Sequence, residues 1–112
     1  MKNNQKINKH MKGNFTQMEI GYVISNLAPE MTARINKSGN IALRHKSNPG
    51  VQFVIYRHDR GLIIRRRIDT DSPFGVGHEM NGNKPFLSIV DLVQYFKRYM
   101  EKYPKNLVTA FK

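Results

Sequence analysis

The amino-acid sequence predicts an α+β fold, in which a central antiparallel sheet is flanked by two helices, one on each face. Three observations predict it. Residues 41–68 contain apolar runs rich in β-branched residues and separated by turn signals, a pattern typical of consecutive antiparallel strands. Apolar residues recur at helical spacing before this region, at residues 28–35, and after it, at residues 88–100. The order of helix, strands, helix and a short closing strand is typical of a single α+β domain.

The most informative strand is predicted at residues 39–47. Alternation places Ile41 and Leu43 on one face and Ala42 and Arg44 on the other, so that a strand apolar on both faces carries one arginine pointing inward. Ala42 leaves room beside the arginine, and no acidic residue lies within seven positions of it on either side. Because a buried arginine needs an anion, this strand predicts an anion-binding site. A strand-end arginine that extends to solvent is the alternative.

Two further strands, at residues 51–56 and 62–68, are predicted to form a hairpin. Both are rich in β-branched or aromatic residues, and a charged turn with a glycine joins them. Alternation places Arg65 and Arg67 together on one face of the second strand and Arg66 on the other. Two arginines therefore share one face of this strand.

One helix is predicted on each side of these strands in the sequence. The first is expected from Ser25, with a proline and a glutamate in its first turn, and ends at residues 38–39. The second is expected to begin after Ser88, to carry Asp91 in its first turn and to end before Pro104. Its apolar stripe makes it the better defined of the two.

Two less regular stretches complete the predicted fold. Residues 69–84 are dense in glycine, asparagine and proline, which favours a loop with one short strand near Phe74 and Val76. Residues 107–111 are expected to return as a short closing strand.

Composition limits the class of protein. The 112 residues fit one domain, which we assign to residues 15–112, after a flexible basic segment at residues 1–14 that has too few apolar residues to fold. The 19 lysines and arginines against 8 acidic residues give a net charge of +11, which predicts an anionic partner such as nucleic acid, an acidic membrane or a phosphorylated protein. The absence of cysteine excludes a disulfide framework, and no apolar run predicts a membrane span or a secretory signal.

Residues 21–111 resemble the Src homology 2 domain, the module that binds phosphotyrosine. The family's motif runs from a glycine through one position of any type and three apolar positions to an arginine, and residues 39–44, Gly-Asn-Ile-Ala-Leu-Arg, match it in register. Ile24 and Ser25 resemble the entry to the family's first helix, and residues 86–96 resemble its second helix. The order of the predicted elements is also that of the family.

The resemblance implies a phosphotyrosine pocket. Arg44 would hold two phosphate oxygens with its planar guanidinium, and the turn after it would correspond to the family's phosphate-binding loop. Arg65 and Arg67 would lie beside the phosphotyrosine ring, and Arg66 would set peptide specificity. The residues implied to bind phosphotyrosine are Arg44, Lys46, Ser47, Asn48, Arg65 and Arg67.

Four departures from the family pattern suggest a divergent member, of the kind found among bacterial effector proteins. Asn26 stands where the family has an arginine on its first helix, His45 and Lys46 replace a glutamate and a serine, and the chain has no tryptophan. Arg66 stands where a tyrosine or another residue often lines the peptide groove. Together with the polar loop before the second helix, these departures predict broad peptide selectivity.

We therefore expect a non-catalytic, monomeric phosphotyrosine-binding module that needs no cofactor or metal. It is expected in the cytoplasm, or in the host cytosol if it is an effector. The four histidines show no metal-ligand or catalytic spacing with carboxylates. The alternative is a module that binds RNA or single-stranded nucleic acid, which the charge favours. No aromatic residue lies within the arginine run at residues 65–67, which counts against this alternative.

Overall fold

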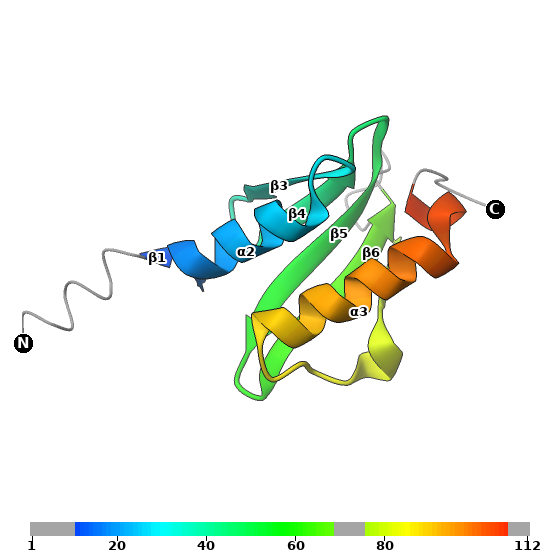
Figure 1. Ribbon diagram of the computed structural model, residues 1–112. Helices are drawn as coiled ribbons and strands as arrows, with labels where there is room; N and C mark the ends of the chain where they lie inside the picture. The colour runs from blue at the N-terminus through cyan, green and yellow to red at the C-terminus, as the bar shows by residue number, and fades with distance from the viewer. Residues whose placement is uncertain (1–10, 69–75, 108–112) are drawn as a thin grey trace, which may run out of the picture.

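The structure, a computed structural model, describes residues 11–68 and 76–107. Its principal elements are five strands of one sheet and two α-helices (Figure 1). In chain order, the elements are β1 (Met11–Lys12), β2 (Phe15–Thr16), α2 (Gln17–Leu27), β3 (Met31–Ile35), β4 (Ile41–His45), β5 (Asn48–His58), β6 (Gly61–Ile68), β7 (Val76–Glu79), the 3-10 turn η1 (Asn81–Asn83), α3 (Ile89–Lys102) and the 3-10 turn η2 (Pro104–Leu107).

The main sheet is antiparallel throughout, with its strands in the order β3-β4-β5-β6-β7. Each strand pairs with the next one in the sequence, so the sheet is built from successive hairpins. The strands expected around residues 39–47, 51–56 and 62–68 are confirmed as β4, β5 and β6. β5 is the central strand and, at 11 residues, the longest.

Both helices lie on one face of this sheet, which corrects the prediction of one helix on each face (Figure 1). The helices contact each other, and their buried residues join a single core with those of β4, β5 and β6. Leu43 and Phe53 are fully buried on this side, and Val23 of α2 and Phe96 of α3 pack in the same cluster. The opposite face carries Arg34, Arg44, Arg65 and Arg67 among its apolar residues, so it lacks the continuous apolar surface that a helix would cover.

The first helix lies earlier in the chain than predicted. α2 begins after Thr16, whose hydroxyl accepts a hydrogen bond from the Glu19 backbone N–H at 3.0 Å, while the Glu19 carboxylate accepts one from the Thr16 N–H at 2.8 Å. This reciprocal pair is a capping box, and it fixes the start of the helix. Residues 31–35, predicted as helix, form β3 instead, because Met-Thr-Ala-Arg-Ile alternates as an edge strand does.

The second helix is confirmed. Ser88 caps α3 by accepting a hydrogen bond from the Asp91 N–H at 3.2 Å, and the helix ends just before Pro104. Its stripe packs on the sheet, with the rings of Phe96 and Phe53 5.0 Å apart between centroids in an edge-to-face arrangement. The short strand expected near Val76 is present as β7.

Three further expectations concern the margins of the described residues. Phe74 and most of the expected closing strand lie outside these residues, and Leu107 belongs to η2. The proposed flexible segment is described only from Met11, where the chain already pairs as β1 with β2. The turn between β1 and β2 packs against the turn between β3 and β4. Gly13 of the first turn and Gly39 of the second have φ of +67° and +83°, and a Cβ on Gly13 would lie 2.7 Å from the Gly39 oxygen.

Candidate functional site

We call the side of the main sheet that faces away from both helices the open face. Its members follow from the strand register, because residues paired across neighbouring antiparallel strands lie on the same face. By this register, the open face comprises Thr32, Arg34, Ala42, Arg44, Gln52, Val54, Tyr56, His58, Ile63, Arg65 and Arg67.

Arginines on the open face form two rows that cross the strands. In the first row, Arg44 of β4 pairs with Gln52 of β5, which pairs with Arg67 of β6. The two arginines are therefore two strands apart, a separation of about 10 Å between backbones. The second row runs from Arg34 through Ala42 and Val54 to Arg65.

Arg44 borders a hollow on the open face rather than pointing into the core. The hollow has a volume of about 270 Å³ and spans β3, β4 and β5. Ala42, which is 3% exposed, contributes to its lining, so the expected space beside the arginine exists. Arg34 and Lys37 line the same hollow, which brings three cations to one place. Arg44 itself is half-buried.

The turn after Arg44 is short, and its backbone donors are already engaged. Lys46 and Ser47 alone connect the paired residues His45 and Asn48. The Lys46 N–H donates to the Glu30 carbonyl at 3.0 Å, and the Ser47 N–H donates to the His45 Nδ1 at 3.2 Å. The Ser47 hydroxyl lies 2.8 Å from the same nitrogen. Two of the donors that a phosphate-binding loop would offer are therefore used within the protein.

The arginine run of β6 is divided between the two faces. Arg65 and Arg67 lie on one face of the strand, as alternation predicted, and that face is the open face, which also carries Arg44. Arg66 pairs with Phe53, a fully buried core residue, and so lies on the helix side. The structure therefore brings Arg44, Arg65 and Arg67 to one surface and places Arg66, the expected specificity residue, on the opposite one.

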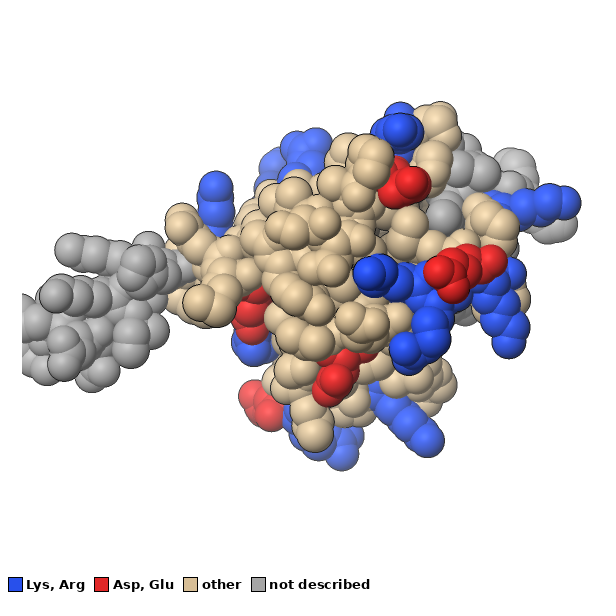
Figure 2. Space-filling model, in the orientation of Figure 1, with Lys and Arg blue, Asp and Glu red and all other residues tan. Residues whose placement is uncertain are grey.

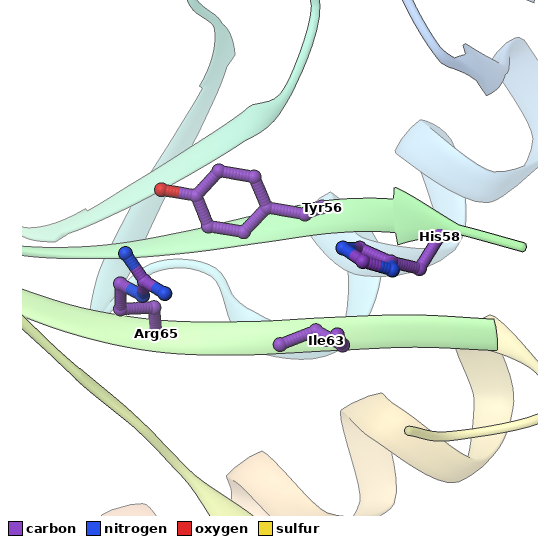
Figure 3. Close-up of a pocket in the computed structure, with 4 residues that line it drawn as sticks. All are labelled: Tyr56, His58, Ile63 and Arg65. Atoms are coloured by element: carbon purple, nitrogen blue, oxygen red, sulfur yellow. The ribbon is translucent and has the colours of Figure 1, made fainter. Parts of the chain in front are cut away.

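A second hollow on the open face combines rings with a cation. It has a volume of about 190 Å³ and is lined by Tyr56 and His58 of β5 and by Ile63 and Arg65 of β6 (Figure 3). The Arg65 guanidinium carbon lies 5.8 Å from the centroid of the Tyr56 ring, a cation–π distance. No local sequence pattern predicted this group, because its two halves come from different strands. Alternation within β5 and the register of the hairpin would have identified it.

The helix side also contains an arginine, and that residue is held by an internal ion pair. The Arg57 Nη2 lies 2.6 Å from both carboxylate oxygens of Glu19, and Nε donates to the Asn14 carbonyl at 2.8 Å. Burial raises the pKa of Glu19, but hydrogen bonds from Arg57 and Thr16 and the Arg57 charge outweigh it and hold the pKa below its ordinary value. Arg57 therefore serves to fasten α2 to β5.

The helix-covered side shows a mixed surface. In Figure 2, acidic side chains of this side lie next to lysine and arginine side chains, and these charged groups surround a broad uncharged area. On the open face, the register places four arginines, Arg34, Arg44, Arg65 and Arg67, and it pairs the backbone of Arg65 with that of Glu79. The two sides thus differ in how evenly their charges are balanced.

In the described part of the chain, no helix is long and apolar enough to cross a membrane. Nor do the described histidines and carboxylates gather in groups of three or more that would hold a metal ion. Comparisons of the chain with protein families, with curated proteins and with solved structures give no match.

Proposed function

We propose that the open face binds nucleic acid through its phosphate groups. The observation that carries this proposal is the distribution of Arg34, Arg44, Arg65 and Arg67 over three strands of one uncovered sheet face. Arginine pairs well with phosphate because its planar guanidinium offers several donors in a fixed arrangement. A net charge of +11 adds long-range attraction to a polyanion.

The spacing of these arginines favours a chain of phosphates over a single one. Neutral residues separate the arginines within each row: Gln52 in the first, and Ala42 and Val54 in the second. Cations about 10 to 14 Å apart, which is two or three strand spacings, can each contact a different phosphate of a polymer, whereas a single phosphate needs donors that converge on one point. The turn at Lys46 and Ser47 offers few backbone donors for such convergence.

Phosphotyrosine binding, the function implied by the resemblance to the Src homology 2 domain, is the second candidate. One observation favours it: Arg44 and Arg67 flank Gln52 in the same row, and their long side chains can reach toward a phosphate between them. This site would bind one phosphate of a peptide and would need the guanidinium geometry of Arg44 in particular.

The test is a fluorescence anisotropy titration of a labelled single-stranded oligonucleotide between 50 and 200 mM salt. Four phosphate contacts, at a slope of about −0.7 each, give a loss of affinity of roughly 50-fold over this range. Parallel titrations use one peptide in its phosphotyrosine and unphosphorylated forms. Tight, phosphate-dependent peptide binding with little response to salt, and no oligonucleotide binding, would contradict the proposal and favour the second candidate.

A matched pair of variants tests the assignment to the open face. Arg67→Gln and Arg66→Gln remove the same charge at neighbouring positions on opposite faces. We expect Arg67→Gln to weaken oligonucleotide binding by roughly three- to ten-fold and to reduce the salt slope by about 0.7, whereas Arg66→Gln changes both only slightly. Equal losses in the two variants would mean that net charge, not this face, holds the nucleic acid.

Arg44→Lys separates the two candidate functions. It keeps the charge but loses the planar guanidinium. A phosphotyrosine pocket would lose on the order of 2 to 5 kcal/mol, or about 30-fold or more in affinity, because a desolvated charge pair is broken. Oligonucleotide binding should change by less than about three-fold, since the phosphate contact remains as a point charge.

A further inference from the structure

The hollow lined by Tyr56, His58, Ile63 and Arg65 has a different character from the one beside Arg44. The Arg44 hollow is bordered by Arg34 and Lys37 as well, and therefore suits phosphate. The Tyr56 hollow has two rings and an aliphatic side chain around one guanidinium (Figure 3). Its composition suits a flat, aromatic group rather than an anion alone.

Tyr56 is held in place by the strand that carries it. It is half-buried, pairs directly with Ile63 across the β5–β6 hairpin, and has the Arg65 guanidinium near its ring. A ring on a sheet face not covered by a helix adds little to the core, but it offers a rigid surface on which another ring can stack. Neighbouring arginines strengthen such a surface through cation–π contacts.

The size and position of the hollow also fit one base of a bound strand. At about 190 Å³ it is smaller than the roughly 300 to 1,000 Å³ of pockets for drug-sized ligands, so it holds one ring system. Gln52, in the first arginine row, precedes Tyr56 by four residues of β5, a distance of about 13 Å along the strand. Roughly four stacked nucleotide steps of about 3.4 Å cover the same distance.

We infer that the Tyr56 hollow is a nucleobase subsite, and hence that the nucleic acid bound by the open face is single-stranded. One base stacks on Tyr56 beside Arg65, while neighbouring phosphates contact the arginine rows. This inference rests on the proposed binding of nucleic acid and adds a requirement for unpaired bases, because bases in a duplex are already stacked and paired.

The experiment compares two eight-nucleotide ligands of equal length and charge, oligothymidylate and a fully abasic oligomer, with the wild-type protein. We expect oligothymidylate to bind about 5- to 150-fold more tightly, the value of one stacked base. Equal affinity for the two ligands would overturn the base subsite while leaving nucleic-acid binding intact. Binding of neither ligand would overturn the proposed function itself.

Three variants locate the effect. Tyr56→Leu should reduce the ratio between the two ligands to near one with an unchanged salt slope, and Tyr56→Phe should keep the ratio because it keeps the ring. Tyr103→Leu, which alters an exposed tyrosine after α3, is the matched control and should change nothing. A Tyr56→Leu protein that folds and keeps the full preference for bases would overturn the assignment to this hollow. The wild-type comparison decides the inference if that variant does not fold.

Discussion

Each face of the main sheet carries aromatic residues and arginines, but these residues have different roles on the two faces. On the helix side, Phe53 of β5 is fully buried, and Arg57 of the same strand is fixed by the Glu19 carboxylate. On the open face, Tyr56 is half-buried and Arg44 borders a hollow. Alternation along a strand assigns each side chain to a face, and the position of the helices then decides whether that face supports folding or meets a ligand.

The strongest way to test this contrast is to truncate one aromatic residue on each face of β5. Phe53→Ala should lower the free energy of unfolding by about 3 to 5 kcal/mol, because it leaves a cavity in the core beside Phe96. Tyr56→Ala should lower it by only about 1 kcal/mol, since its ring lies outside that core. Urea denaturation with comparable m-values measures both. Similar losses would mean that the open face also supports the fold.

A second comparison exchanges one arginine on each side for glutamine. Arg57→Gln should lower the free energy of unfolding by about 1 kcal/mol, because it removes the ion pair to Glu19 and a hydrogen bond to Asn14, and it should leave oligonucleotide affinity nearly unchanged. Arg44→Gln should weaken oligonucleotide binding at least three-fold with little loss of stability. Thermal unfolding measures the stability of each variant, and anisotropy titration measures its oligonucleotide affinity. A reversed pattern would contradict the division of roles.

The smallest expected effect is a pH dependence confined to the helix side. The folded pKa of Glu19 is below its ordinary value of 4.5, so its ion pair stabilises the fold fully above that value. The contribution is lost as the pH falls through the folded pKa. Glu19→Gln should therefore lower stability at neutral pH and flatten the stability profile below pH 4.5. An unchanged acid limb in denaturation curves collected across this range would argue against the pair.

Much of the fold follows from local patterns. Apolar runs rich in β-branched residues and bounded by turn signals predicted β4, β5 and β6, and the Ser88 cap with its apolar stripe predicted α3. The first helix was misplaced because Ser25 and the proline after it looked like a helix start. The true start, Thr16-Gln17-Met18-Glu19, is also visible in the sequence as a capping box, and α2 has apolar residues on several sides, which blurs its helical period.

The site was only partly predictable for a different reason. Alternation placed Arg65 and Arg67 together, but no local pattern states which face of a sheet the helices cover. That choice depends on how α2 and α3 pack against each other. The hollow at Tyr56 and Arg65 depends on the register of a hairpin, and so appears only when the strands are paired. The resemblance to the Src homology 2 domain stays a prediction.

The neutral residues between the arginines limit the charge density of the open face. Like charges directly opposite each other on neighbouring strands repel and destabilise a sheet, and residue 52 lies opposite Arg44 on one side and Arg67 on the other, so a neutral glutamine there avoids two such repulsions. Gln52 therefore sets the charge density of its row without touching the core. An additional cation at position 52 would raise the affinity for polyanions and lower the stability of the unliganded protein. Affinity and stability are thus opposed at a single central position, and a glutamine keeps them in balance.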